Sequence, residues 1–249
     1  MSGLSPIILA KLANDAGFVV ELGEASGWLA FAMPGRDLKL WLRAQDATLI
    51  AALSRRDVLA ELPIGAPWSG SLPGGAAGAR QVASPNDLLT LLHRARVLER
   101  TLPDALLTQY QQATAHIDAT EAEALVRQRR GQALFRQGLL DYWGGRCAIS
   151  GLDVPELLRA SHAKPWKDAS DAERLDVHNG LLLAAHLDAA YDQGLITVHP
   201  DGRVEPSPRL PASALAVLGL TAPLYVHGLK AAHAPFLTWH VEHVYMAVS

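Results

Sequence analysis

The chain has 249 residues, of which 49% are hydrophobic and 19% charged, and its formal net charge at pH 7 is −3. This composition predicts a compact globular protein of one large or two small domains, and no apolar run is long enough to span a membrane. The single cysteine, Cys147, excludes an intramolecular disulfide framework and a four-cysteine zinc site.

The first residues lack the basic start, long apolar middle and small-residue cleavage site of a secretion signal. Together with the lone cysteine, this predicts a reduced compartment, and we expect a cytoplasmic protein that contacts no membrane. The net negative charge neither supports nor excludes nucleic acid as a partner, because affinity for a phosphate backbone depends on where Lys and Arg gather.

The first part of the sequence predicts a mixed domain of helix and antiparallel sheet. A helix is expected over residues 5–16, ended by Gly17. Three short apolar runs between turn residues predict strands at residues 18–22, 28–32 and 38–42. A Gly-, Pro- and Ser-rich stretch over residues 63–85 predicts a long surface loop, and two further helices are expected, after Asn86 and from Pro103.

A change of texture predicts a domain boundary between residues 1–116 and residues 117–249. Thr120 and Glu123 have the spacing of a capping box, in which hydroxyl and carboxylate each satisfy a backbone N–H at the start of a helix. The helix that they open is expected to end at Gly144. Short strands, turns and many polar residues follow it.

Residues whose side chains can act in catalysis or bind a metal lie in this second half, on segments expected in the order strand, loop, strand, helix. His162 lies on the first expected strand, and Asn179 lies in a tight turn before the second. The helix that follows carries His186, Asp188 and Asp192. Because Asp188 and Asp192 are four residues apart, they face the same side of that helix.

This order of motifs resembles the HNH (ββα-metal) endonucleases, and within them a restriction-endonuclease-like branch with SHxxPW, NGLLL and FDxGLI motifs. The matching segments are Ser161–Trp166, Asn179–Leu183 and Tyr191–Ile196. A lead-in of GQ, FR, LL and CAVTG motifs is matched within residues 131–151, so the resemblance covers roughly residues 120–200. It implies a helical lead-in and a ββα-metal nuclease domain. Together with the mixed helix and antiparallel-sheet domain that the residue pattern predicts before them, the chain is expected to be α+β.

The resemblance implies catalytic roles for three residues. His162 takes the place of the general base that deprotonates a water for attack on the scissile phosphate, a task that suits an imidazole because it titrates near neutral pH. Asn179 takes the middle position, where a side-chain amide fixes the loop and orients the base. His186 is the third catalytic candidate.

The resemblance also implies one divalent metal ion, with His186, Asp188 and Asp192 as its candidate ligands. Paired carboxylates favour Mg²⁺ or Mn²⁺, which prefer oxygen ligands. The position of the family's last His is Asp188 here. The residue before the base, which often is a ligand, is Ser161, so the ligand from the first strand stays open.

Nearby basic residues are candidates to bind the DNA backbone. They are Arg129, Arg130, Arg136, Lys164 and Lys167. The alternative for the arginines of the expected helix is a solvated helix face without a ligand.

These features predict a metal-dependent DNA endonuclease of the restriction or defence kind, with modification-dependent cleavage as one form of it. The first domain would choose the DNA and the second would cut it. Three alternatives stay open: an effector nuclease gated by a small-molecule signal or a partner, an inactive HNH fold that only binds DNA, and a secreted nuclease toxin. Residues 1–116 resemble no family, and their pattern is compatible with a reader of modified bases, a sensor of a small signal or a homodimer contact.

Overall fold

The computed structural model describes residues 5–115 and 121–247. The chain forms two compact units, Met1–Arg100 and Thr101–Ser249. Helices combined with antiparallel sheets confirm the predicted α+β class. None of the described helices has the length and apolar content that a membrane span requires.

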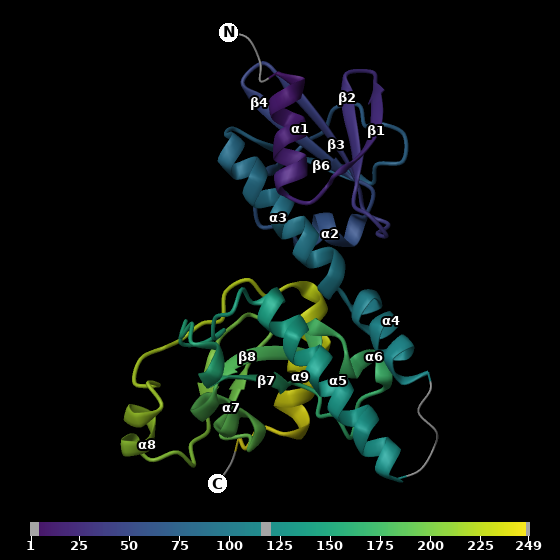
Figure 1. Ribbon diagram of the computed structural model, residues 1–249. Coiled ribbons are helices and arrows are strands. Elements are labelled where there is room, and N and C mark those ends of the chain that lie inside the picture. The colour runs from purple at the N-terminus through teal and green to yellow at the C-terminus, as the bar shows by residue number, and fades with distance from the viewer. Residues whose placement is uncertain (1–4, 116–120, 248–249) are drawn as a thin grey trace. The chain divides into compact units, whose positions relative to one another are not determined.

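A six-stranded antiparallel sheet, of strand order β1-β2-β3-β4-β6-β5, forms the centre of the first unit. In chain order its elements are α1 (Pro6–Asp15), β1 (Val20–Ala25), β2 (Trp28–Ala32), β3 (Lys39–Gln45), β4 (Thr48–Leu53), α2 (Arg56–Glu61), β5 (Ala66–Pro67), β6 (Gly78–Val82) and α3 (Pro85–Thr101). Successive strand residues point to opposite faces, and Phe31, Leu40 and Leu53 lie in one cross-strand row. All three side chains are buried. Helices α1 and α3 lie against one face of the sheet (Figure 1).

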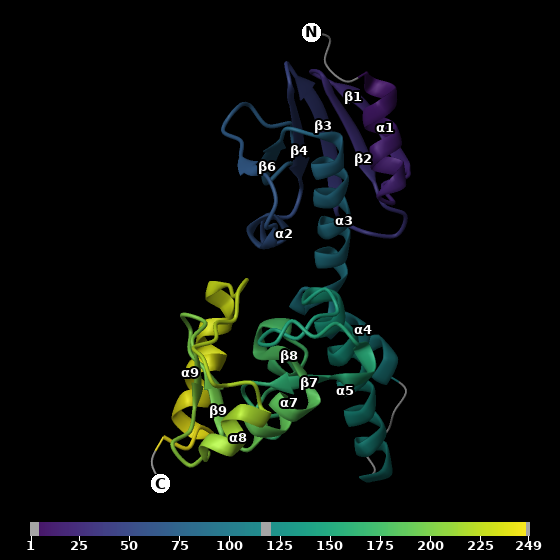
Figure 2. The same cartoon turned by 90° about the vertical axis from the view of Figure 1, so that its left-hand side faces the viewer.

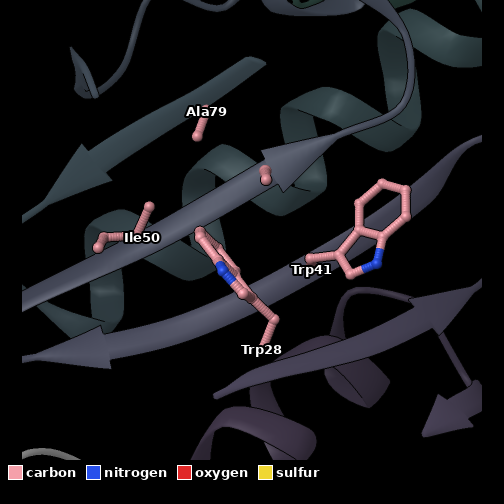
Figure 3. Packing of buried hydrophobic residues seen from close by; sticks show 5 residues of the cluster. Trp28, Trp41, Ile50 and Ala79 are labelled. Atoms are coloured by element: carbon pink, nitrogen blue, oxygen red, sulfur yellow. The ribbon is translucent and has the colours of Figure 1, made fainter. Parts of the chain in front are cut away.

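The opposite face of the sheet carries a cluster of buried side chains around Trp28, Trp41 and Ile50 (Figure 3). Trp68, from the segment after β5, packs edge-on against Trp28, with the ring centroids 5.6 Å apart. Apolar side chains therefore cover both faces of the central strands β2, β3 and β4, where the core of the unit lies.

The prediction of a long surface loop over residues 63–85 is wrong, because strands β5 and β6 lie within this segment. Strand β6 pairs with β4 and places Ala79 opposite Ala52. Its middle residue, Arg80, is polar and masks the alternation in the sequence. The Arg80 guanidinium donates to the carbonyl oxygens of Leu59 and Gly65, at 3.0 and 3.2 Å, so it ties β6 to the neighbouring segments.

The second unit is built around the antiparallel pair β7–β8. Its elements are α4 (Pro103–Thr114), α5 (Glu121–Tyr142), η1 (Pro155–Leu157), β7 (Leu158–His162), α6 (Asp171–Arg174), η2 (Val177–Asn179), β8 (Gly180–Ala184), α7 (Ala185–Asp192), β9 (Ile196–Val198), β10 (Val204–Pro206), α8 (Ala212–Val217), η3 (Ala231–His233) and α9 (Ala234–His243). Figure 2 shows α5 and α9 on either side of the β7–β8 pair. The order β7, β8, α7 is the strand, strand, helix arrangement that the motifs predict.

The units divide before residue 101, earlier than the predicted boundary at residue 116, because α4 packs on α5. A Cβ added at Gly138 of α5 would lie 2.6 Å from a methyl carbon of Leu106 in α4. The Arg130 side chain also donates to the carbonyl oxygen of Ala113. Thr120, half of the predicted capping box, lies outside the described residues.

Candidate active site

A cleft of about 650 Å³ opens in the second unit, beside the end of β7. Its walls come from elements that are far apart in the sequence. They include Gln132 of α5, His162 of β7, Trp166 and Lys167 of the following loop, Asp192 at the end of α7, and His243 of α9. The cleft thus joins the candidate base and one of the candidate metal ligands.

His162 ends strand β7, where it pairs with Gly180 of β8. Its ring stacks on Phe135 of α5, with centroids 3.7 Å apart and planes 12° apart. Gly180 is required at this point, because a Cβ there would lie 2.4 Å from the Phe135 ring. Nε2 of His162 lies 2.9 Å from the carbonyl oxygen of Arg174. Since a carbonyl only accepts, Nε2 carries the hydrogen and Nδ1 keeps its lone pair.

Burial lowers the pKa of His162 to about 4, against the opposite effect of its hydrogen bond to the Arg174 carbonyl, and the positive charge of Arg174 lowers it further. The imidazole is therefore neutral at pH 7 and able to take up a proton through Nδ1. A neutral, oriented imidazole on the wall of an open cleft has the form that a general base needs.

Trp166 and Arg174 frame the other side of the imidazole. The Trp166 ring meets the His162 ring edge-on, and the Arg174 guanidinium lies over the Trp166 ring, 5.1 Å from its centroid. Nε of Arg174 also donates to the Trp166 carbonyl oxygen, at 2.8 Å. Trp166 packs on α5 at Gly131, where a Cβ would lie 2.5 Å from the indole. This explains the pairing of the GQ and PW motifs in structural terms.

Asn179 is fully buried and fixes the loop that follows His162. Its Oδ1 accepts from the backbone N–H of Lys164, at 2.8 Å. Its Nδ2 donates to the carbonyl oxygens of Lys164 and Glu173, at 3.2 and 2.9 Å, and its own carbonyl accepts from the N–H of Ala163. These contacts allow Asn179 to position the base, whereas the side chain itself is closed off from the cleft.

The carboxylates of Asp188 and Asp192 lie on one face of α7, and Ser161 of β7 donates a hydrogen bond to Asp188. Asp192 is open to the cleft, yet the surrounding protein still desolvates it. This burial, and then the charge of Asp188, raise the pKa of Asp192 to about 6. Within residues 5–115 and 121–247, no group of three or more His, Cys, Asp or Glu side chains is arranged to hold a metal ion. The donors present are thus two carboxylates and a hydroxyl, a set that fits Mg²⁺, which commonly keeps several waters and takes one or two carboxylates.

His186 does not join this group. It is exposed, and two residues before Asp188 it points about 200° away around the helix. The structure therefore does not bring His186 together with Asp188 and Asp192, as the predicted metal site requires.

The five predicted DNA-binding residues fall into two groups. Arg136 holds the turn before β7 by donating to the carbonyl oxygens of Leu158 and Pro155. Lys164 forms an ion pair with Glu173, 2.7 Å from Oε1, and Arg130 binds the backbone of α4. Lys167 and Arg129 are exposed, and Lys167 lines the cleft.

Helix α9 contributes His240 to the wall of the cleft. The His240 ring is buried and stacks on Tyr191, with centroids 3.8 Å apart. Its Nε2 donates to the Tyr191 carbonyl oxygen, at 3.1 Å, so Nδ1 accepts from the Thr197 hydroxyl, at 2.9 Å. Next to it, a Cβ at Gly194 would lie 2.1 Å from the carbonyl oxygen of Val244, so only glycine lets the end of α9 approach α7.

The buried imidazole of His240 predicts a loss of stability in acid. Burial lowers the pKa of His240 to about 4 in the folded state, below the 6.5 of the free side chain. The contribution of His240 to the free energy of unfolding is therefore fully present above pH 6.5 and is lost as the pH falls to about 4. This loss is on the order of 3 kcal/mol. His162 contributes in the same direction.

Urea unfolding of the full chain between pH 4 and pH 7 measures this effect. The parent should lose stability toward pH 4, and His240→Gln should show a smaller dependence on pH even if it is less stable throughout. An unchanged slope in His240→Gln would mean that this imidazole is not held neutral.

Residues 147–199 match the family model described as HNH endonuclease. The matched segment contains β7, β8 and α7, and so includes His162, Asn179, Asp188 and Asp192. Helices α5 and α9, which provide Phe135 and two cleft histidines, lie outside it. Among curated proteins, none matches the chain. The family match supports assigning this segment to the HNH endonucleases, and with it a nuclease activity.

Proposed function

We propose that the chain is a divalent-metal-dependent endodeoxyribonuclease whose second unit hydrolyses phosphodiester bonds in the cleft between β7, α7 and α9. The observation that carries this proposal is a neutral, oriented imidazole in the same cleft as an acidic residue of α7, both within the HNH-matched segment. The bare carboxylates would repel a phosphate, whereas a cation between them would attract it.

His162 is the general base in this proposal. Its Nδ1 takes the proton from the attacking water, while the hydrogen bond from Nε2 to the Arg174 carbonyl fixes the ring and favours the imidazolium that forms. Asn179 keeps the loop after His162 in place, and Phe135 keeps the ring from turning. The base is thus held from both sides before substrate arrives, which limits reorganisation during the reaction.

Asp188 and Asp192 would hold Mg²⁺ or Mn²⁺, with the Ser161 hydroxyl beside them. When bound, such an ion neutralises charge on the scissile phosphate and stabilises the leaving oxygen. Lys167 and Arg129 would contact neighbouring phosphates from the rim. Arg136, Lys164 and Arg130 shape the protein around the site instead.

The first unit would choose the DNA, in a restriction or defence role. Lys167 is the one Lys or Arg among the described residues that line the cleft, so the second unit would hold DNA weakly alone. A second DNA contact would raise the local concentration of substrate. Gating of the nuclease by a small molecule or a partner is the alternative use of the first unit.

The full chain should be tested on plasmid DNA that is unmodified, methylated, hydroxymethylated or phosphorothioated, with Mg²⁺ or Mn²⁺. A nuclease that reads modification should cut one of these substrates at least about tenfold faster than the others, a difference of about 1.4 kcal/mol in selectivity. Equal rates on all four would contradict modification-dependent cleavage while leaving the nuclease itself intact. A chain that binds but cuts none of them, with every metal tried, would be the inactive DNA-binding module.

A further inference from the structure

A small cleft in the first unit is lined mainly by arginine side chains. Its volume is about 170 Å³, and its walls come from the end of α1, the β2–β3 turn and α3. The charged residues among its walls are Arg36, Arg96, Arg100 and Glu99. Three arginines and one glutamate thus line the same cleft.

Glu99 balances only part of this charge. It is buried at 6% exposure and forms an ion pair with Arg36, in which the guanidinium nitrogen lies 3.8 Å from the carboxylate oxygen. Among the residues that the structure describes, no carboxylate forms an ion pair with Arg96, which is exposed at the rim. The positive charge of Arg96 is therefore not neutralised by a carboxylate, and an anion that entered the cleft would be attracted to it.

The backbone is shaped to admit Arg96. Its guanidinium lies against Gly17, where an added Cβ would be 2.9 Å from Nη1. Gly17 has φ of +94°, a conformation that favours glycine, so the chain turns here without a side chain that would displace the guanidinium. The carbonyl groups at the end of α1 also attract a positive charge to this position.

We propose that this arginine cleft binds a phosphate group, and that in the proposed nuclease it holds a phosphate of the DNA backbone. The planar guanidinium fork matches phosphate oxygens in two parallel hydrogen bonds, and the cleft has room for several waters or one phosphate group. The source of the phosphate rests on the proposed function, since a free nucleotide presents the same chemistry. A contact with a backbone phosphate would not by itself distinguish DNA sequences, but it would fix where DNA lies on the first unit.

The experiment measures binding of a fluorescent DNA duplex to the full chain in excess chelator, so that no cleavage is needed. Arg36→Gln/Arg96→Gln is compared with Arg43→Gln, which removes the same type of charge from the tryptophan-bearing face of the sheet. In the double variant the duplex affinity should fall, and the slope of log K against log salt should become shallower by about 0.9, the loss of one phosphate contact. Arg43→Gln should keep the parent slope, and Arg36→Lys/Arg96→Lys should recover part of the affinity, because charge returns without the fork.

A parallel titration with a nucleoside monophosphate and with inorganic phosphate identifies the source. Loss of nucleotide binding in the double variant, with duplex binding unchanged, would keep the phosphate site and assign it to a free nucleotide. If duplex, nucleotide and phosphate all bind the folded double variant as they bind Arg43→Gln, the cleft is no phosphate site. If the proposed nuclease function is wrong, the parent will not cleave DNA with metal. That result is distinguishable from the binding results that test the phosphate site.

Discussion

His162→Ala is expected to lower the rate of DNA cleavage by roughly 10²–10⁴-fold, the usual contribution of a general base. The change removes the Nδ1 lone pair that would accept the proton of the attacking water. It also removes a ring that stacks on Phe135. His162→Gln is the companion variant, because its amide can still donate to the Arg174 carbonyl and fill part of the space. Rates are measured on supercoiled plasmid with saturating Mn²⁺, after circular dichroism shows that each variant is folded.

His227→Ala is the matched control, since His227 is exposed, lies in the same unit and is absent from the cleft walls. It should cut at the parent rate. DNA binding in chelator should be nearly the same in all four proteins. Rates of folded His162→Ala and His162→Gln within a few-fold of the parent would remove His162 from the role of base.

Asp188→Asn and Asp192→Asn are expected to raise the Mg²⁺ or Mn²⁺ concentration for half-maximal cleavage by at least about tenfold, because each would remove a charged oxygen from the proposed metal site. The control is Glu156→Gln, an exposed acidic residue at the turn before β7. It should leave the metal titration unchanged.

Thermal unfolding provides a second test of the same pair that needs no activity. Since burial and Asp188 raise the pKa of Asp192 to about 6, the charged pair destabilises the metal-free protein at pH 7, and Asp192→Asn should melt at a higher temperature than the parent in chelator. Added Mn²⁺ should stabilise the parent, as a ligand of the folded state does, and should stabilise the variant less. Equal responses to Mn²⁺ in parent and both variants would place the metal elsewhere.

The cleft residues that could be predicted from the sequence are those fixed by local geometry. A strand that leads through His162 into a Pro-Trp stretch, and two acids four apart on a helix, define their own orientation once the elements are recognised. The chain places His162 and Asp192 in one cleft for that reason. His186 is the exception, and helix geometry explains it, because residues two apart point to nearly opposite sides.

The fate of the basic side chains could not be predicted, because it depends on contacts between distant segments. Arg136 lies on the same helix as the exposed Arg129, but it reaches two carbonyl groups more than eighteen residues away. Lys164 is neutralised by Glu173 across a loop. Strand β6 could not be predicted for the same reason, because it forms by pairing with the distant strand β4 although a Gly- and Pro-rich sequence precedes it. Helix α9, from outside the motifs, adds His243 to the cleft only through its packing at Gly194.

In the proposed nuclease, DNA is hydrolysed in the cleft that holds His162 and Asp192, with Asp188 on the same face of α7 as Asp192. The most direct measurement is nicking of supercoiled plasmid by the full chain and by His162→Ala in parallel, first with Mn²⁺ and then with excess chelator. We expect nicking by the parent with Mn²⁺, loss of nicking in excess chelator, and its return when Mn²⁺ is added back. Nicking by the parent in chelator, or equal nicking by His162→Ala and the parent, would contradict it.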